Sequence, residues 1–236
     1  MNQPILLDTF CCAGGSATGY ERAGFVVYGI DKKAQPRFPF PFIKIDTLKA
    51  LDILLSGDKL TFNNGENLSL DDISVIHASP PCQIHSRMRK LNVSQGVAKN
   101  YKELIAPVRT KLKATGKIYI IENVEGSPLI DPITLCGSSF GLLVRRHRLF
   151  ESNVSLWGKP CAHYIEVKDK PNLNRLHKGN SRVVGCYGHG RGKGDTVELW
   201  SKAMGIDWMS RHELSQAIPP AYTEWIGSQV IDILNN

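Results

Sequence analysis

The chain has 236 residues and a formal net charge of +7; 42% of its residues are hydrophobic and 22% are charged. This balance suits one folded domain, or one domain with a small lobe, and it excludes disordered, collagen-like and coiled-coil proteins. No apolar run approaches the ~18 residues of a transmembrane helix, and the start lacks the features of a secretory signal, so we expect a cytoplasmic protein with no membrane association and with reduced cysteines.

Short apolar runs alternate with amphipathic segments along the first half of the chain. The apolar runs predict strands, in chain order, at 4–8, 25–31, 42–46, 73–79 and 117–123. Helices are expected at 16–23, at 47–55 and around 104–112. A basic strand over 144–150 and helices over 196–203 and 222–234 follow. Strand–helix alternation predicts an α/β fold with a mostly parallel sheet and helices on both faces.

Four of the predicted strands carry an acidic residue at their carboxyl end, namely Asp8, Asp31, Asp46 and Glu122, the last directly before Asn123. Ligands of open α/β sheets bind at this edge, although strand ends are also polar simply because they meet water. Glycines follow the first strand at 14 and 15, without a phosphate-binding lysine and without the GxGxxG pattern of dinucleotide sites. The ligand expected here is nucleoside-like and lacks a pyrophosphate, with Asp31 accepting from ribose hydroxyls; a plain glycine turn is the alternative.

A cysteine on a stiff loop follows the fourth strand. Pro80 and Pro81 hold the backbone extended before Cys82, which favours a nucleophile facing a cleft over a buried structural cysteine. Its basic neighbours, His85, Arg87, Arg89 and Lys90, are expected to favour its thiolate. Glu122, at the end of the next strand, is a candidate acid. Alternation places Arg146 and Arg148 on one strand face, which indicates an anion-binding site or a solvated basic strand.

These motifs in this order resemble the DNA cytosine-5 methyltransferase family. They are Asp-x-Phe-x-x-x-Gly-Gly at 8–15, Pro-Pro-Cys-Gln at 80–83, Glu-Asn-Val at 122–124 and Arg-Arg-x-Arg at 145–148. Residues 216–220 resemble the last motif of that family, and 204–208 a degenerate form of the preceding one. The order also fits small phage-type members and restriction-modification enzymes. The resemblance implies a Rossmann-like S-adenosylmethionine-dependent methyltransferase fold, with a catalytic domain at 1–150 and 199–236 and a reduced, loop-rich DNA-contacting lobe at 151–198.

The resemblance also implies a reaction and its residues. A methyl group would pass from S-adenosylmethionine to carbon 5 of a flipped cytosine in DNA, through a covalent cysteine–cytosine intermediate. Cys82 would be the nucleophile, Glu122 the acid at ring nitrogen 3, Arg148 a contact to the base carbonyl, Arg146 a phosphate contact, and Asn123 a support for the Pro81–Cys82 backbone. The implied cofactor contacts are Phe10, Gly14, Gly15, Asp31, Asp46, Pro80, Pro81, Gln216 and Ala217. No metal is required.

Some positions depart from the family pattern. Cys12 stands where the family has glycine, and Lys32 stands where an apolar or aromatic contact to adenine is common. Val144 replaces a glutamine, and Gln216 replaces an asparagine. The change at 216 leaves open the transfer of a group other than methyl from a related donor. Only about 50 residues stand where larger members insert a recognition lobe, so we expect short sequence readout or a protein partner that supplies it, and a monomer. The loop 83–99 and the lobe carry basic residues suited to DNA, at Arg87, Arg89, Lys90, Lys99, Lys168, Lys170, Arg175, Lys178, Arg182, Arg191 and Lys193.

Three alternatives stay open. The same chemistry could act on RNA, on a nucleotide or on a modified cytosine. The chain could instead be an inactive DNA-binding accessory or decoy, although retention of both Cys82 and Glu122 argues against this. Cys161 and His163, with Cys186 and His189, could bind zinc, but their spacing fits no standard zinc pattern.

Overall fold

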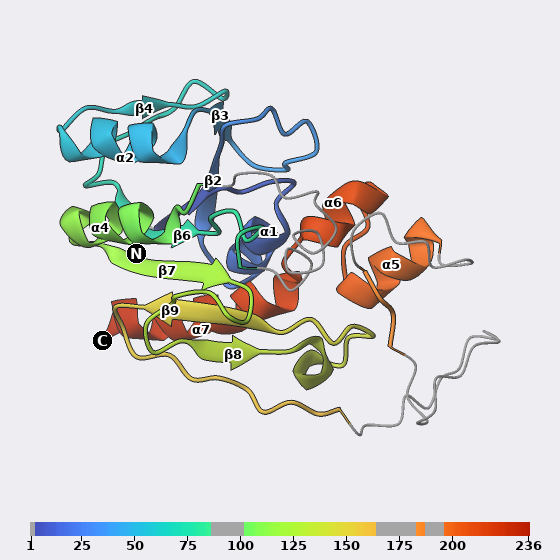
Figure 1. The fold of residues 1–236 in the computed structure, drawn as a ribbon. Coiled ribbons are helices and arrows are strands. Elements are labelled where there is room, and N and C mark those ends of the chain that lie inside the picture. The colour runs from blue at the N-terminus through green and yellow to red at the C-terminus, as the bar shows by residue number, and fades with distance from the viewer. Residues whose placement is uncertain (1–2, 86–101, 164–182, 187–195) are drawn as a thin grey trace.

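A computed structural model describes residues 3–85, 102–163, 183–186 and 196–236 of the chain (Figure 1). A seven-stranded sheet has the order β3-β2-β1-β6-β7-β9-β8, beside a separate two-stranded sheet, β4-β5. The strands are β1 (Ile5–Thr9), β2 (Val26–Asp31), β3 (Phe42–Lys44), β4 (Leu60–Thr61), β5 (Asn67–Leu68), β6 (Ile73–Ala78), β7 (Ile118–Asn123), β8 (Ile133–Leu135) and β9 (Arg148–Ser152). The helices are α1 (Gly15–Arg22), α2 (Thr47–Leu55), α4 (Ile105–Thr115), η1 (Gly137–Phe140), α5 (Val197–Met204), α6 (Arg211–Gln216) and α7 (Pro220–Asn235).

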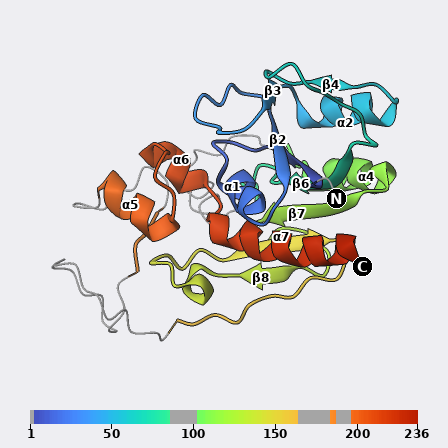
Figure 2. The same ribbon diagram turned by 180° about the vertical axis from the view of Figure 1, so that it is seen from behind.

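The sheet is mostly parallel and covered on both faces, as the sequence predicted. Strands β3, β2, β1, β6 and β7 run parallel, β9 is antiparallel to β7, and β8 is antiparallel to β9. Successive side chains of a strand point to opposite faces. Accordingly Leu6 and Val75 pack with α1 and α7, whereas Leu7 and Ile76 pack with α2 and α4. Figure 2, from behind, shows α7 crossing the face that Figure 1 hides.

Strand β1 has β2 on one side and β6 on the other, so the chain winds outward in both directions from the β1–β6 pair. Crevices at such a switch point, outside the carboxyl ends of the strands, bind the ligands of open α/β sheets. Thr9 pairs with Ala78 in register, and the Ser79 amide donates to the Thr9 carbonyl at 3.2 Å. The loops that follow β1 and β6 therefore begin side by side.

Helix α1 packs closely against the start of α7, two segments from opposite ends of the sequence. A Cβ atom on Gly19 would lie 2.1 Å from the Pro220 carbonyl oxygen, so only glycine allows this approach. The Thr223 hydroxyl donates to the Ser16 carbonyl at 2.8 Å. The turn after β1 is thus held from behind by the C-terminal helix.

The structure corrects one predicted strand and adds elements that the sequence analysis did not predict. The strand expected over 144–150 begins only at Arg148 and continues to Ser152. Strands β4, β5 and β8 and helices η1 and α6 were not predicted. Val184 and Cys186, inside the proposed lobe, are buried in a third apolar cluster with α5. Among the described residues, no helix is long and apolar enough to cross a membrane.

Candidate active site

The loop after β6 holds Cys82 at the edge of the sheet. Pro80 is buried and Cys82 is half-buried, so the thiol is not sealed in the core. Asn123, the last residue of β7, donates from Nδ2 to the Pro80 carbonyl at 2.9 Å. The side chain expected to support the backbone at Pro81–Cys82 therefore does so one residue earlier. This hydrogen bond joins the end of β7 to the loop after β6, next to Cys82.

The buried Glu122 and the half-buried Arg148 form an ion pair beside this loop. Arg148 Nε lies 3.0 Å from Glu122 Oε1, because β9 runs antiparallel to β7 and brings the start of one strand to the end of the other. Burial raises the pKa of the Glu122 carboxyl, against the lowering effects of Arg148, Ser79 and Arg146. Glu122 is thus a carboxyl that can hold a proton more readily than an exposed one.

The Cys82 thiol lies within the electrostatic reach of the same pair. Burial and the Glu122 carboxylate raise its pKa, and the Arg148 and Arg146 guanidiniums oppose this rise. Desolvation and the like charge of Glu122 therefore outweigh the two arginines. The basic residues that the sequence analysis expected to favour the thiolate were His85, Arg87, Arg89 and Lys90; the last three lie outside the described residues, so their effect on the thiol stays a prediction.

A chain of hydrogen bonds runs under the site and was missed by sequence reasoning. The Tyr20 hydroxyl lies 2.9 Å from His77 Nδ1, His77 Nε2 lies 2.9 Å from the Ser79 hydroxyl, and Ser79 hydrogen-bonds the Glu122 side chain. Burial lowers the pKa of His77 to about 3, so its imidazole is neutral. With Glu122 ionised, Ser79 donates to the carboxylate, His77 donates to Ser79 and Tyr20 donates to His77. The sequence held one signal of this chain of hydrogen bonds, namely His77 inside the otherwise mostly apolar run 73–78.

Arg146 does not lie where a phosphate contact requires it. Its side chain is buried, and its guanidinium donates to the Cys186 carbonyl at 2.9 Å and the Ser215 carbonyl at 2.6 Å. The Tyr222 hydroxyl donates to the backbone carbonyl of Arg146 at 2.6 Å. Arg146 therefore joins three distant segments, and the predicted shared strand face with Arg148 is wrong because the strand starts two residues later.

The turn after β1 has an unusual backbone that Asp31 stabilises. Phe10, Cys12 and Gly14 have positive φ angles of 59°, 47° and 87°. Asp31 accepts from the Cys12 amide at 3.2 Å and from the Lys33 amide at 2.9 Å. The acid predicted to bind ribose hydroxyls thus lies at the turn and fixes its shape, and the half-buried Phe10 ring borders the same edge.

Residues 217 and 218 of the last motif pack against this turn. A Cβ on Gly15 would lie 2.4 Å from the Ile218 carbonyl oxygen and 3.4 Å from Ala217 Cβ. Trp208 Nε1 donates to the Ala13 carbonyl at 2.8 Å, a contact that sequence reasoning did not assign. Residues from 208 to 218 therefore form part of the wall around the turn.

Two of the predicted cofactor residues have contacts within their own helices. Asp46 is exposed and caps α2, accepting from the Leu48 amide at 3.0 Å through Oδ1. Gln216 is exposed, and its amide nitrogen lies 3.0 Å from His212 Nε2. The remaining predicted cofactor residues come from the turn between β1 and the start of α1, the end of β2, the loop after β6 and the segment after α6: Phe10, Gly14, Gly15, Asp31, Pro80, Pro81 and Ala217.

Asp8 lies fully buried beneath this turn, where it accepts from the Ser16 hydroxyl at 2.7 Å. Burial raises its pKa to about 7. Its carboxyl therefore belongs to the support of the turn, although its strand end was predicted as part of the ligand edge.

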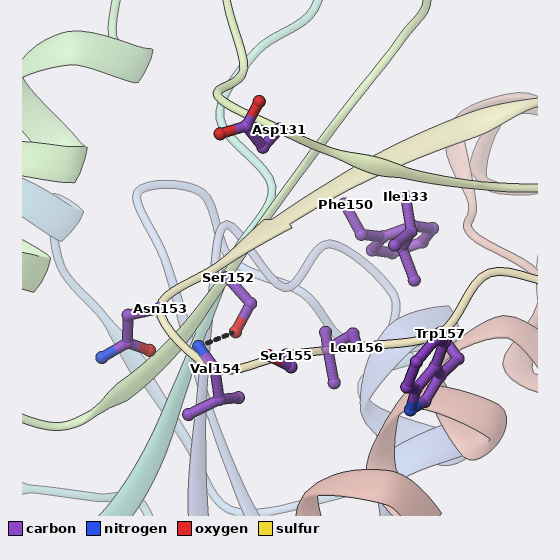
Figure 3. Close-up of a pocket in the computed structure, with 9 residues that line it drawn as sticks. All are labelled: Asp131, Ile133, Phe150, Ser152, Asn153, Val154, Ser155, Leu156 and Trp157. Atoms are coloured by element: carbon purple, nitrogen blue, oxygen red, sulfur yellow. Dashed lines mark hydrogen bonds between the residues drawn. The ribbon is translucent and has the colours of Figure 1, made fainter.

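A surface cavity of about 490 Å³ lies elsewhere, where β8, β9 and the following segment meet (Figure 3). Its lining runs from Asp131 to the exposed Trp157 and includes none of the predicted site residues.

The basic residues of the lobe that were expected to bind DNA, together with His189, lie outside the described residues, as does most of the loop 83–99.

Comparison with known proteins agrees with this geometry. The chain is 30% identical over 132 residues to the type II methyltransferase M.XorII of Xanthomonas oryzae pv. oryzae, a match that covers 53% of this chain and 29% of that protein. The chain therefore matches less than a third of that relative's length.

Solved structures share the fold at low sequence identity. A protein described as a DNA modification methyltransferase encoded within a prophage of E. coli has a TM-score of 0.56 and 15% identity, over 99% of this chain and 100% of that one. The Dnmt2 methyltransferase of S. pombe has a TM-score of 0.54 and 13% identity, with 100% of both chains covered. These likenesses support the Rossmann-like methyltransferase fold.

The family profile gives the assignment. Residues 5–128 match the C-5 cytosine-specific DNA methylases, and this range holds the turn after β1, the Cys82 loop and Glu122. With more than half of its length matched, this chain is a member of the C-5 cytosine-specific DNA methylase family.

Proposed function

We propose that this chain transfers a methyl group from S-adenosylmethionine to carbon 5 of a flipped cytosine in DNA, with Cys82 as the covalent nucleophile. The observation that carries the proposal is the Glu122–Arg148 ion pair at 3.0 Å, which acts electrostatically on a half-buried cysteine held between two strand ends. Family membership supports cytosine in DNA as the substrate, and a net charge of +7 favours a polyanion over a free nucleotide.

The proposed chemistry begins with activation of a poor nucleophile. The Cys82 thiolate forms a bond to carbon 6 of the ring, and the ring electrons shift so that carbon 5 becomes nucleophilic. Glu122, whose pKa burial raises, holds a proton for ring nitrogen 3 and so stabilises the charge that develops there. Arg148 orients Glu122. A protonated Glu122 also no longer repels the Cys82 thiolate, so protonation of Glu122 favours ionisation of Cys82.

The bound cofactor supplies an electrophilic methyl group. Carbon 5 gains that methyl group and then loses its proton to solvent. The electron pair left behind re-forms the double bond between carbons 5 and 6 and expels the Cys82 thiolate, while ring nitrogen 3 returns its proton to Glu122. The described residues suit a nucleoside-bearing donor: Asp31 offers carboxylate oxygens at the switch point, and Phe10 presents a half-buried ring beside it. Gly14 and Gly15 would lie beside the amino-acid part, and Pro80 and Pro81 beside the methyl group.

Incubation with S-adenosylmethionine carrying a tritiated methyl group, together with duplex DNA, RNA or dCMP, tests the proposal. We expect label in DNA alone. DNA containing 5-fluorocytosine should yield a stable covalent adduct, because carbon 5 then has no proton to lose, whereas matched cytosine DNA should not. Cys82→Ser should abolish both transfer and adduct while cofactor binding survives.

Other outcomes separate the alternatives. Label in RNA but not in DNA would assign the same chemistry to another polymer. Tight DNA binding without label in any acceptor would identify a non-catalytic accessory protein. Normal transfer by Cys82→Ser would overturn the covalent mechanism.

A further inference from the structure

Four potential metal ligands converge outside the active centre described above. They are Cys136, His147, Cys161 and His163, and their ligand atoms all lie within 4.8 Å of one another. Cys136 Sγ lies 3.4 Å from His163 Nε2, and His147 Nε2 lies 3.3 Å from Cys161 Sγ. Two thiols and two imidazoles thus face a common point.

Three chain segments are held together at this point. Cys136 precedes η1, His147 precedes β9, and residues 159–163 follow β9. The Ser139 hydroxyl donates to the Pro160 carbonyl at 2.7 Å, which joins the first segment to the third. Arg145 donates to the His163 carbonyl at 2.9 Å, which joins the second to the third. The cluster is therefore fixed by contacts that do not depend on its four side chains.

The backbone approach within the cluster is also close. A Cβ atom on Gly137 would lie 2.2 Å from the Val144 carbonyl oxygen, so glycine is needed directly after Cys136. The Ser138 hydroxyl donates to Cys136 Sγ at 3.1 Å and accepts from the Ala162 amide at 3.2 Å. A hydroxyl that donates to a ligand sulfur is the kind of outer contact that orients and stabilises a metal-bound thiolate.

We propose that these four side chains bind one zinc ion in a closed, structural site. Zinc favours four-coordinate tetrahedral sets of cysteine and histidine, with bonds of about 2.3 Å to sulfur and about 2.0–2.1 Å to nitrogen. Tetrahedral angles then separate a sulfur from a nitrogen by about 3.6 Å, close to the two separations between these ligand atoms. Two thiolates balance the charge of the ion, so the site adds no net charge beside the arginines at 145, 146 and 148.

The position of His147 gives the site a structural role. His147 lies between Arg146, which joins distant backbone segments, and Arg148, which pairs with Glu122. A metal bond to His147 would anchor this segment to the chain on either side. Zinc would therefore act as a positioning device for Arg148, distinct from the reaction itself.

This ligand set differs from the one that the sequence suggested. Cys186 is buried in the apolar cluster with Val184 and Trp200 and is not one of the four converging side chains. Cys136, which is as buried as Cys186, is the cysteine ligand in place of Cys186. The two buried cysteines thus provide a matched pair of variants.

The test is the metal content of the full chain purified without chelator, then again after dialysis against Zn²⁺. We expect about one zinc per chain, retained in Cys186→Ala and lost in Cys136→Ala. Cys161→Ser, at an exposed position, should also lose the metal while keeping the circular dichroism of the fold, which guards against misfolding of Cys136→Ala. Co²⁺ should replace zinc and give the visible absorption of a tetrahedral cobalt–thiolate site.

A second readout tests the positioning role. Hydrogen exchange in a peptide covering 144–149 should quicken when a chelator removes the metal. Unchanged exchange after metal removal would refute the positioning role. Absence of zinc after dialysis against Zn²⁺, retention by Cys161→Ser, or loss in Cys186→Ala alone would each overturn the site.

Discussion

Asp8→Asn should change how the free energy of unfolding depends on pH. The Asp8 carboxyl has an ordinary pKa of 3.8 when exposed, and burial raises that value to about 7 in the folded protein. The folded state therefore binds a proton more tightly than the unfolded state. Asp8 contributes stability that is complete below the unfolded pKa and is lost as the pH rises through about 7.

The size of the effect follows from the two pKa values. Each pH unit between them changes the free energy of unfolding by about 1.4 kcal/mol. Between about pH 4.5 and about pH 8 the wild type should thus lose about 3 kcal/mol relative to Asp8→Asn, whose amide does not titrate. Asparagine retains an oxygen that can accept from the Ser16 hydroxyl, so the substitution changes charge more than shape.

His77 contributes with the opposite sign. Its folded pKa is lowered to about 3 from 6.5, so its contribution is present above the unfolded pKa and lost as the pH falls. Both proteins carry His77, and its contribution therefore cancels in the difference between them. In the wild type the two effects oppose each other between roughly pH 4 and pH 6.5, so the wild-type curve should be flatter than either residue alone would make it.

Urea unfolding at several pH values, followed by tryptophan fluorescence and by circular dichroism, gives the measurement. Coincident transitions by the two methods support a two-state analysis. If the free energies of unfolding of wild type and Asp8→Asn change in parallel from about pH 4.5 to about pH 8, burial does not raise the pKa of Asp8 and the reasoning is refuted.

Two further substitutions test the site and its support. Glu122→Gln should lower methyl transfer by a factor on the order of 100, yet speed alkylation of Cys82 by iodoacetamide, because the carboxylate that raises the thiol pKa is gone; slower alkylation would contradict the assignment. Arg109→Ala should cost about 3 kcal/mol of unfolding free energy, since it leaves the buried Glu151 carboxylate without its two 2.7 Å hydrogen bonds. Arg37→Ala, which breaks the exposed ion pair of Arg37 with Glu213, is the control. It should lower the free energy of unfolding by less than about 1 kcal/mol in the same urea titration.

Much of the fold could be predicted because its strands are buried on both faces. Continuous apolar runs such as 73–78 have few other stable placements, and the strand order then brings Cys82 and Glu122 to one edge. Helix α6 also had a readable signal, since Ser210 and Glu213 form a capping box. The alternation of short apolar runs with amphipathic segments was therefore enough to predict the sheet edge at which the site lies.

The role of Arg146 could not be predicted by the same means. Period-two alternation from Val144 to Phe150 is compatible with a strand that starts at either end. Arg146 is buried because its guanidinium binds the carbonyls of Cys186 and Ser215, which lie 40 and 69 residues away in the sequence. The strand therefore begins only at Arg148. Local sequence carries no information about partners at that distance.

The converging cysteines and histidines show the same limit. Cys136, His147 and Cys161 are separated by ten and thirteen intervening residues, unlike the short spacings of common zinc motifs. Their meeting depends on β8 and β9 pairing as antiparallel neighbours, and β8 was not predicted from its three residues.

The tight packing of the first helix on the last one has a consequence for biosynthesis. While the polypeptide emerges from the ribosome, Gly15 and Gly19 are made early, but the carbonyls and the threonine that pack on them follow about 200 residues later. Closing so long a loop is entropically costly and slow. A nascent chain thus exposes this glycine-lined surface until α7 has emerged from the ribosome.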